Sequence, residues 1–380
     1  MRSPASYISQ RANAVDASGI RKVFDLAARM KDPINLSIGL PDFDVPEVAK
    51  AAAIEAIQKG QNRYTQTQGI EPLRSRLRAD LSKEFGRDVG EVLITSGVSG
   101  GLFLAILATI NPGDEAIFLD PYFVMYKHLL TLAGGRAVMV DSYPDFRFHA
   151  DRVERAITPK SKVLILNSPS NPTGVVMTPA EVRDAVEIAR KHDLLIISDE
   201  IYEPFLYGRD ARDGDMAGLP SPLKLYENTL LLRGFSKSHA MTGWRLGYAI
   251  GPEPIVSQMT KLQQYTYVCA PSALQYAALK AMDVPMQAAV DAYSRKRDIA
   301  FETLSKKFEV VQPGGAFYIF PKAPAGYRGG ATDFVSKAIE NNVLVIPGNV
   351  FSERDTHFRI SYATTDERLR QGCEILNSLA

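Results

Sequence analysis

The sequence predicts an α/β protein in which helices cover both faces of a mostly parallel β-sheet, together with a smaller α+β domain. The middle of the chain alternates short apolar runs with longer segments of helical pattern. Residues 163–166 (Val-Leu-Ile-Leu) and 194–197 (Leu-Leu-Ile-Ile) are apolar at every position, which is typical of strands buried on both faces of a parallel sheet. The length of 380 residues is right for one large and one smaller domain.

The order of these segments supports strand–helix alternation, which favours a sheet sandwiched by helices. Thr178 is a candidate N-cap for the helix expected at 179–192, and Glu181 is the capping-box acid three residues later. We expect strands at residues 91–95, 116–119, 163–166, 194–198, 230–232 and 247–250, and helices at 102–110, 123–132 and 179–192.

The pattern changes after about residue 285. We expect a helix at 287–308, a strand at 316–320, a helix at 332–341 and a strand at 358–361. The sequence therefore predicts a large domain at residues 46–285 and a smaller α+β domain formed by residues 1–45 and 286–380.

Composition limits the possible partners. The chain has 44 basic and 43 acidic residues, so its net charge of +1 gives no reason to expect nucleic acid or an anionic membrane as partner. No apolar stretch approaches the roughly 18–20 residues of a membrane span, and no signal peptide is visible. Cys269 and Cys373 are isolated, and the five histidines lack metal-ligand spacing. We expect a cytoplasmic protein with free thiols and no metal.

One lysine occupies an unusual place. Lys237 follows the predicted strand at 230–232, and ligands of open α/β sheets bind at the carboxyl ends of strands. A lysine that is partly desolvated or near other cations has a lowered pKa and forms an imine with an aldehyde cofactor. Arg245 offers a planar fork for a phosphate. For an isolated Ser-Lys pair, a solvated surface lysine is the simpler interpretation. The assignment of Lys237 as a cofactor lysine therefore depends on the residues around it.

Those surroundings carry a resemblance to a known family. Ser236-Lys237 followed by residues 241–248 (Met-Thr-Gly-Trp-Arg-Leu-Gly-Tyr) resembles the cofactor-lysine signature of the fold-type I, class I/II aminotransferases, which use pyridoxal 5′-phosphate (PLP). Residues 39–43, 171–174, 198–202 and 359–363 are similar to further motifs of this family, in the family's order. The resemblance covers nearly the whole chain and is strongest to aspartate and aromatic aminotransferases of bacterial and archaeal type. It implies a seven-stranded-type sheet, PLP as Schiff-base cofactor and a homodimer with shared active sites.

The resemblance assigns residues to the cofactor ring. A buried carboxylate keeps the pyridine nitrogen of PLP protonated, and Asp199 at the end of a predicted strand fits that position. Tyr202 and Asn171 are expected at the phenolic oxygen of the cofactor. Phe123 is expected to stack on the ring face.

Further residues are expected at the cofactor phosphate and at the substrate. The Gly-rich turn at 96–101 precedes an apolar helix, whose free N–H groups favour a dianion. This turn is neither the dinucleotide G-x-G-x-x-G nor a P-loop. Gly234 stands where many family members have Ser or Thr, which removes one phosphate contact. The expected phosphate residues are Gly97, Val98, Ser99, Ser236, Arg245 and, from the partner subunit, Tyr64.

Arg359 is the expected clamp for the substrate α-carboxylate, because a bidentate arginine fits that group and orients the Cα–H bond. Gly39 is the family's small residue nearby. The sequence identifies no cation for a distal carboxylate, and the specificity pocket is expected to include residues 14–20 and the partner subunit.

The sequence thus predicts a PLP-dependent aminotransferase that passes an amino group by a ping-pong route from an amino acid to a 2-oxo acid such as 2-oxoglutarate, and the resemblance implies aspartate or an aromatic amino acid as the donor. Lys237 is the expected proton carrier. A carbon–sulfur β-lyase or a 1-aminocyclopropane-1-carboxylate synthase-like enzyme stays open, because motifs at the cofactor do not separate these activities. A nucleotide-dependent oxidoreductase is a remote alternative, and a non-catalytic regulator would need a DNA-binding module for which the chain has no spare length.

Overall fold

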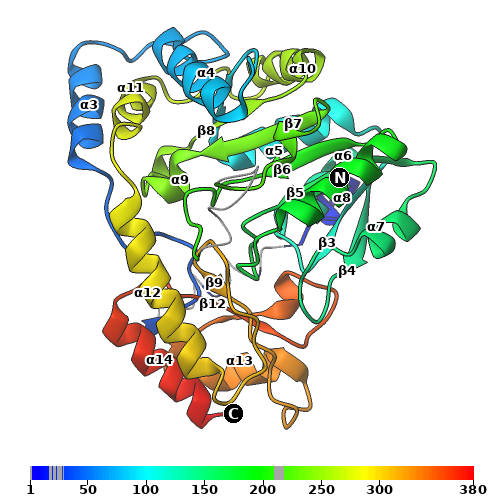
Figure 1. Cartoon of the computed structure of the whole chain (residues 1–380), viewed down its shortest axis with the longest axis vertical. Coiled ribbons are helices and arrows are strands. Elements are labelled where there is room, and N and C mark those ends of the chain that lie inside the picture. Colours follow the sequence, from blue (N-terminus) through cyan, green and yellow to red (C-terminus); the bar gives the residue numbers. More distant parts are fainter. Residues whose placement is uncertain (1, 17–18, 20–22, 24–27, 29, 209–217) are drawn as a thin grey trace.

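A seven-stranded sheet forms the centre of the molecule (Figure 1). The computed structural model describes residues 2–16, 19, 23, 28, 30–208 and 218–380. The strand order is β2-β8-β7-β6-β5-β3-β4, and β8 alone runs antiparallel to its neighbours, so the sheet is mostly parallel as predicted. The strands are β2 (Leu93–Ser96), β3 (Glu115–Asp120), β4 (Arg136–Asp141), β5 (Ser161–Asn167), β6 (Leu195–Asp199), β7 (Thr229–Gly234) and β8 (Leu246–Ile250).

Side-chain alternation along the strands builds a core on each face of the sheet. In β7, Leu230 and Leu232 pack in the core that holds α5, α6 and α10, whereas Leu231 packs on the opposite face with α3, α4 and α11. A third core joins β3, β5 and β6 to α7 and α8. The helices are α3 (Glu47–Gln58), α4 (Glu71–Phe85), α5 (Gly97–Thr109), α6 (Met125–Ala133), α7 (Ala150–Ala156), α8 (Pro179–Lys191), α10 (Glu253–Gln264) and α11 (Ser272–Ala281).

The predicted capping box is present at the start of α8. The Thr178 hydroxyl accepts a hydrogen bond from the backbone N–H of Glu181, and the Glu181 carboxylate accepts one from the backbone N–H of Thr178. These reciprocal bonds satisfy two N–H groups that the first helical turn leaves without partners.

A second layer of structure lies below the large sheet in Figure 1. It holds α12 (Gln287–Leu304), α13 (Gly330–Glu340), α14 (Asp366–Ser378) and a small sheet of β11 (Ile346–Pro347), β12 (Phe358–Ser361) and β9 (Tyr318–Ile319). β1 (Ile34–Asn35) pairs with β10 (Val343–Leu344), so the N-terminal segment joins the C-terminal part of the chain. This pairing supports the division at residues 45/46 and 285/286, which we keep as a proposal.

Several elements differ from the sequence-based expectations. β9 has two residues where five were expected, since only Tyr318 and Ile319 pair in register with β12, while the N–H of Ala316 donates to the carbonyl of Phe205 instead. β4 was not predicted, since it is an edge strand with an incompletely buried pattern and lacks a fully apolar run. Helix α5 begins at Gly97, five residues before the apolar run that predicted it.

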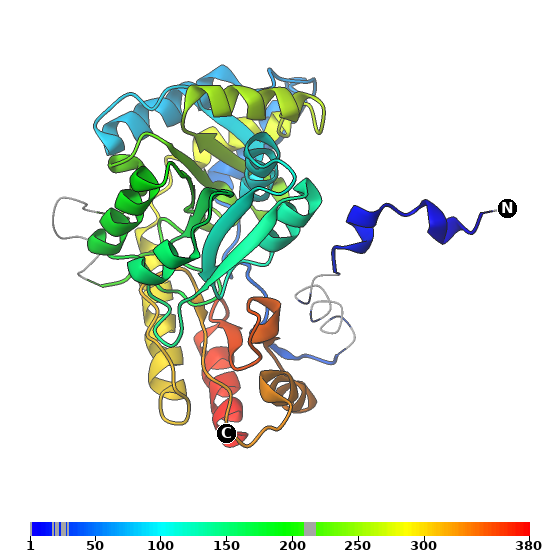
Figure 2. The ribbon, with the colours of Figure 1, turned by 90° about the vertical axis from the view of Figure 1, so that its right-hand side faces the viewer.

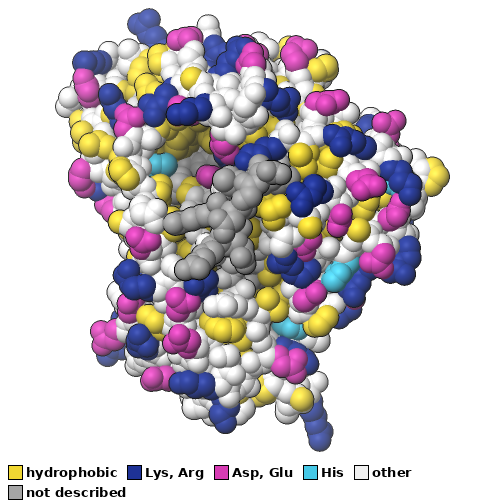
Figure 3. Space-filling view, in the orientation of Figure 1, with side chains coloured by type: hydrophobic (Ala, Val, Ile, Leu, Met, Phe, Trp, Pro, Cys, Tyr) yellow, Lys and Arg dark blue, Asp and Glu magenta, His cyan; other side chains and the backbone are white. Residues whose placement is uncertain are grey.

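The surface carries both signs of charge. In Figure 3, Lys and Arg side chains are interspersed with Asp and Glu over the face shown. Among the described residues, no helix is both long and apolar enough to cross a membrane.

Candidate active site

A cavity of about 320 Å³ opens at the carboxyl ends of the central strands, between the large sheet and strands β9 and β12. It lies where ligands of α/β sheets bind. The structure brings most of the sequence-predicted site residues together in its wall. These are Gly39, Val98, Ser99, Phe123, Asn171, Asp199, Tyr202, Ser236, Lys237, Arg245 and Arg359.

Lys237 projects from the short helix α9 (Phe235–Ser238), which follows β7 directly. Its amine donates a hydrogen bond of 2.6 Å to the backbone carbonyl of Gly39. Burial, with the positive charges of Arg359 and Arg245, lowers the pKa of Lys237 to about 8. A larger share of this amine is therefore unprotonated near neutral pH than of an exposed lysine, as nucleophilic attack on an aldehyde requires.

Asp199 is the last residue of β6 and is 2% exposed. Its Oδ2 accepts a hydrogen bond of 2.7 Å from the hydroxyl of Tyr126, and its Oδ1 accepts a longer one of 3.4 Å from the backbone N–H of Ile201. Burial raises the pKa of the Asp199 carboxyl to about 6, against the lowering effect of the Tyr126 hydrogen bond. A cation in the cavity would favour the carboxylate form.

Asn167 ties Asp199 to the next strand. Its side-chain amide donates to the backbone carbonyl of Asp199 at 3.0 Å and accepts from the backbone N–H of Asn171 at 2.9 Å. The two strand ends are neighbours in the sheet, with Asn167 paired to Asp199. The sequence analysis missed Asn167, although it lies at the predicted end of β5 and lines the cavity.

Tyr318 is another site residue that the sequence analysis missed. Its hydroxyl lies 2.8 Å from the hydroxyl of Tyr202, and both side chains are buried. A Cβ atom on Gly39 would lie 2.1 Å from the Tyr318 hydroxyl oxygen, so a larger residue at 39 would clash with this pair. The small residue predicted at position 39 therefore has a steric cause.

Arg359 in β12 is 1% exposed and lies between two rings, with its guanidinium carbon 4.5 Å from the Tyr318 centroid and 4.6 Å from that of Phe351. It donates from Nη1 to Asn171 Oδ1 at 2.9 Å and from Nη2 to the carbonyl of Ser37 at 2.7 Å. Its Nε is buried and has no hydrogen-bond partner among the described residues. A buried cation with an unused donor suits a carboxylate ligand.

The opposite end of the cavity has groups that suit an anion. Strand β2 passes directly into α5 at Gly97, whose φ of 69° is readily adopted by glycine. A Cβ atom at Gly97 would lie 2.7 Å from Nη2 of Arg245, so glycine also gives the guanidinium its space. Arg245 donates to the carbonyl of Thr242 at 2.9 Å. The first turn of α5, with Val98 and Ser99, and Ser236 complete this end.

Tyr64 does not line this cavity. It is 83% exposed and belongs to a separate surface hollow formed by residues 62–64, 267 and 269–272. The segment 14–20, expected in the specificity pocket, lies partly outside the described residues.

The residues in the cavity fit PLP. The amine of Lys237 suits an aldehyde, the carboxyl of Asp199 suits a ring nitrogen, and the turn with Arg245 suits a phosphate. Fold and site together define a PLP enzyme of fold type I.

Comparison with known proteins agrees. The sequence matches the family "aminotransferase class I and II" over residues 31–376. It is 37% identical to aromatic-amino-acid aminotransferase 2 of Thermococcus litoralis, over 97% of this chain and 96% of that protein. It is also 37% identical to the aspartate aminotransferase of Pyrococcus abyssi, over the same shares of the two chains. A solved single mutant of Thermus thermophilus aspartate aminotransferase superposes with a TM-score of 0.92 at 34% identity, over 100% of both chains.

The chain therefore belongs to the class I and II aminotransferases. It is a PLP-dependent aminotransferase, and the comparisons do not favour the lyase, synthase or oxidoreductase alternatives.

Proposed function

We propose that this aminotransferase takes the α-amino group of aspartate or an aromatic amino acid and passes it to a 2-oxo acid such as 2-oxoglutarate. The observation that carries the proposal is the position of Lys237, whose amine shares one cavity with the Asp199 carboxyl and the buried Arg359 guanidinium. The names of the relatives from Thermococcus litoralis and Pyrococcus abyssi support the choice of donors.

Each residue has a proposed task. PLP, when bound, supplies an electron sink for the charge that develops at the substrate Cα. Arg359 binds the α-carboxylate and so orients the Cα–H bond. With PLP bound, the amine of Lys237 would hold the cofactor aldehyde, and as a free amine it would accept the proton that leaves the substrate Cα. Asp199 would hold the ring nitrogen, Tyr202 and Asn171 would contact the phenolic oxygen, and Phe123 would cover the ring face. Ser99, Ser236 and Arg245 bind the phosphate.

A visible-absorbance experiment tests the reaction. The holoenzyme is titrated with single amino acids, and then with 2-oxoglutarate. An active donor shifts the cofactor band to shorter wavelength, and 2-oxoglutarate restores it, because the amino group has passed from donor to cofactor and on to acceptor. A reaction that yields ammonia and a 2-oxo acid without any acceptor would instead identify a lyase.

Replacing Arg359 by lysine is expected to raise KM for the amino donor about 100-fold, which corresponds to about 2.7 kcal/mol, because lysine does not bind a carboxylate through a planar fork. The absorbance of the bound cofactor should stay close to that of the wild type. Steady-state kinetics measure the change, and Arg368→Lys, at a half-buried arginine that pairs with Asp32 away from the cavity, is the matched control. An unchanged KM for the amino donor would mean that Arg359 does not bind the substrate.

We further propose that the protein is a homodimer in which Tyr64 of the partner subunit contacts the cofactor phosphate. Tyr64 and Tyr265 are 83% and 82% exposed, which is unusual for large aromatic side chains. The N-terminal helices Pro4–Tyr7 and Gln10–Asn13 extend away from the body of the protomer (Figure 2), and Tyr7 is also exposed. A second subunit would cover these residues.

Mixed dimers are expected to reveal a shared site. The Lys237→Ala homodimer should be inactive and the Tyr64→Ala homodimer weakened in cofactor binding. A purified heterodimer of the two variants should recover one intact site, about half of the wild-type activity per dimer, because the intact Lys237 meets the intact Tyr64 across the interface. Differently tagged subunits allow its isolation. Activity no higher than that of the Tyr64→Ala homodimer would place Tyr64 in its own subunit's site or outside any site.

A cytoplasmic location also remains part of the proposal. It is supported by Cys269 and Cys373, which are both free thiols.

A further inference from the structure

The hydroxyl of Tyr126 has one hydrogen-bond partner among the described residues, and that partner is Asp199. Tyr126 lies on the first turn of α6 and is 2% exposed, and its hydroxyl donates to Asp199 Oδ2 at 2.7 Å. A phenylalanine would fill the same space without a polar group. The hydroxyl therefore contributes a hydrogen bond to the carboxylate and is not needed for packing. A buried hydroxyl without this bond would lower the stability of the folded protein by about 1–3 kcal/mol.

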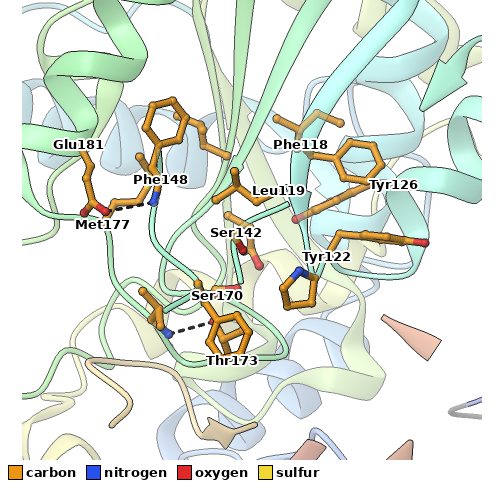
Figure 4. A pocket seen from close by; sticks show the side chains of 16 residues that line it. Phe118, Leu119, Tyr122, Tyr126, Ser142, Phe148, Ser170, Thr173, Met177 and Glu181 are labelled. Carbon is orange, nitrogen blue, oxygen red and sulfur yellow. Dashed lines mark hydrogen bonds between the residues drawn. The ribbon is translucent and has the colours of Figure 1, made fainter. Parts of the chain in front are cut away.

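Aromatic neighbours fix the direction of that hydroxyl. The Tyr126 ring meets Phe118 edge-on at a centroid distance of 5.7 Å and Phe123 at 5.8 Å with an interplanar angle of 82°. Tyr126 and Phe118 also line a small pocket beside the active site (Figure 4). Edge-to-face packing of this kind limits ring movement. The donor is thus already in place before any ligand enters.

The bond leaves the second oxygen of Asp199 available. Oδ1 accepts only the 3.4 Å bond from the backbone N–H of Ile201 among the described residues, so it retains capacity for a ring N–H. The groups that face the carboxyl are Tyr126 from α6, Tyr202 and Glu200 from the segment after β6, and Lys237 from α9. Burial and the Glu200 charge raise the pKa of Asp199, while Tyr126 and Lys237 lower it.

We propose that Tyr126 is a positioning residue, which orients the Asp199 carboxylate and keeps it charged for the cofactor ring nitrogen. The inference rests on the proposed placement of that nitrogen at Asp199. Loss of the hydroxyl removes a donor to the charged form, so more of Asp199 becomes neutral near pH 7. A neutral carboxyl holds a protonated ring nitrogen less strongly.

Tyr126→Phe is expected to weaken PLP binding about 10-fold and to shift the pH at which the visible band of the bound cofactor changes. Affinity is measured by quenching of the fluorescence of Trp244, the only tryptophan, and circular dichroism verifies the fold. Tyr122→Phe is the matched control, because Tyr122 is a buried tyrosine nearby whose hydroxyl bonds to Glu353 at 3.3 Å instead. The control should leave both readouts unchanged.

A double-mutant cycle separates positioning from packing. In the Asp199→Asn background, Tyr126→Phe should change PLP affinity less than about twofold, because the hydroxyl acts through the carboxylate. Equal losses in both backgrounds, or wild-type affinity of Tyr126→Phe, would overturn the inference. If Tyr126→Phe folds poorly, Tyr126→His, which retains a ring and a donor, is expected to bind PLP within about threefold of the wild type, and a loss of about 10-fold or more by this variant would count against the inference. Unchanged affinity of Asp199→Asn alone would instead contradict the placement of the ring nitrogen, and so the proposed function of Asp199.

Discussion

Lys237→Ala is expected to lower turnover at least about 1,000-fold, because it removes both the covalent anchor of the cofactor and the proposed proton carrier. Weak PLP binding should persist through Arg245, Ser236 and the start of α5, none of which is altered. The long-wavelength absorbance of the lysine-linked cofactor should disappear. Kinetics with aspartate and 2-oxoglutarate, together with the visible spectrum, measure the two effects.

The structure explains why this lysine differs from the many others on the chain. Burial and two neighbouring arginines lower its pKa to about 8, so a larger share of this amine is unprotonated near neutral pH than of an exposed lysine. Lys307→Ala, at an exposed position, is the control. Reduction of the holoenzyme with borohydride, followed by peptide mass spectrometry, should locate the cofactor on Lys237. A label on another lysine, or appreciable turnover by Lys237→Ala, would contradict the assignment.

The fold was predictable where the sequence of a single segment indicates its own secondary structure. Apolar runs such as 163–166 identify buried parallel strands, and the Thr178 and Glu181 pair identifies a helix start. Edge strand β4 gave no such signal, because its residues are only partly buried. The start of α5 at Gly97 was missed because its first five residues include three glycines, which give no apolar periodicity, and two of them, Gly97 and Gly100, face Arg245 and Tyr267.

The site was predictable where motifs mark it, and not where contacts alone create it. Lys237, Asp199 and Arg359 lie in segments with a distinctive order of residues. Tyr126 and Tyr318 lie in ordinary apolar segments, and their partners Asp199 and Tyr202 are 73 and 116 residues away along the chain. The residues next to such a tyrosine in the sequence do not distinguish it from a tyrosine whose ring only packs in the core. Only the fold brings the hydroxyl groups to their partners.

Asp199→Asn is expected to lower turnover by about 100- to 1,000-fold while the protein still folds and binds PLP, because the amide has nearly the same shape but no charge. The wild-type carboxylate stabilises a protonated ring nitrogen, and that positive charge makes the ring a stronger electron sink when the substrate Cα loses its proton. An asparagine cannot favour the protonated nitrogen in this way. The effect should therefore appear mainly in kcat, with a smaller change in KM for the amino donor.

The size of this effect follows from the burial of Asp199. At 2% exposure water cannot replace the missing charge, whereas at the exposed control position, Asp184→Asn, it can. Single-turnover measurements with aspartate, monitored by the cofactor absorbance, isolate the proton-transfer step from product release. A kcat within a few-fold of the wild type would mean that the ring nitrogen needs no anion here. The buried Tyr126–Asp199 pair would then contribute to the stability of the strand end alone.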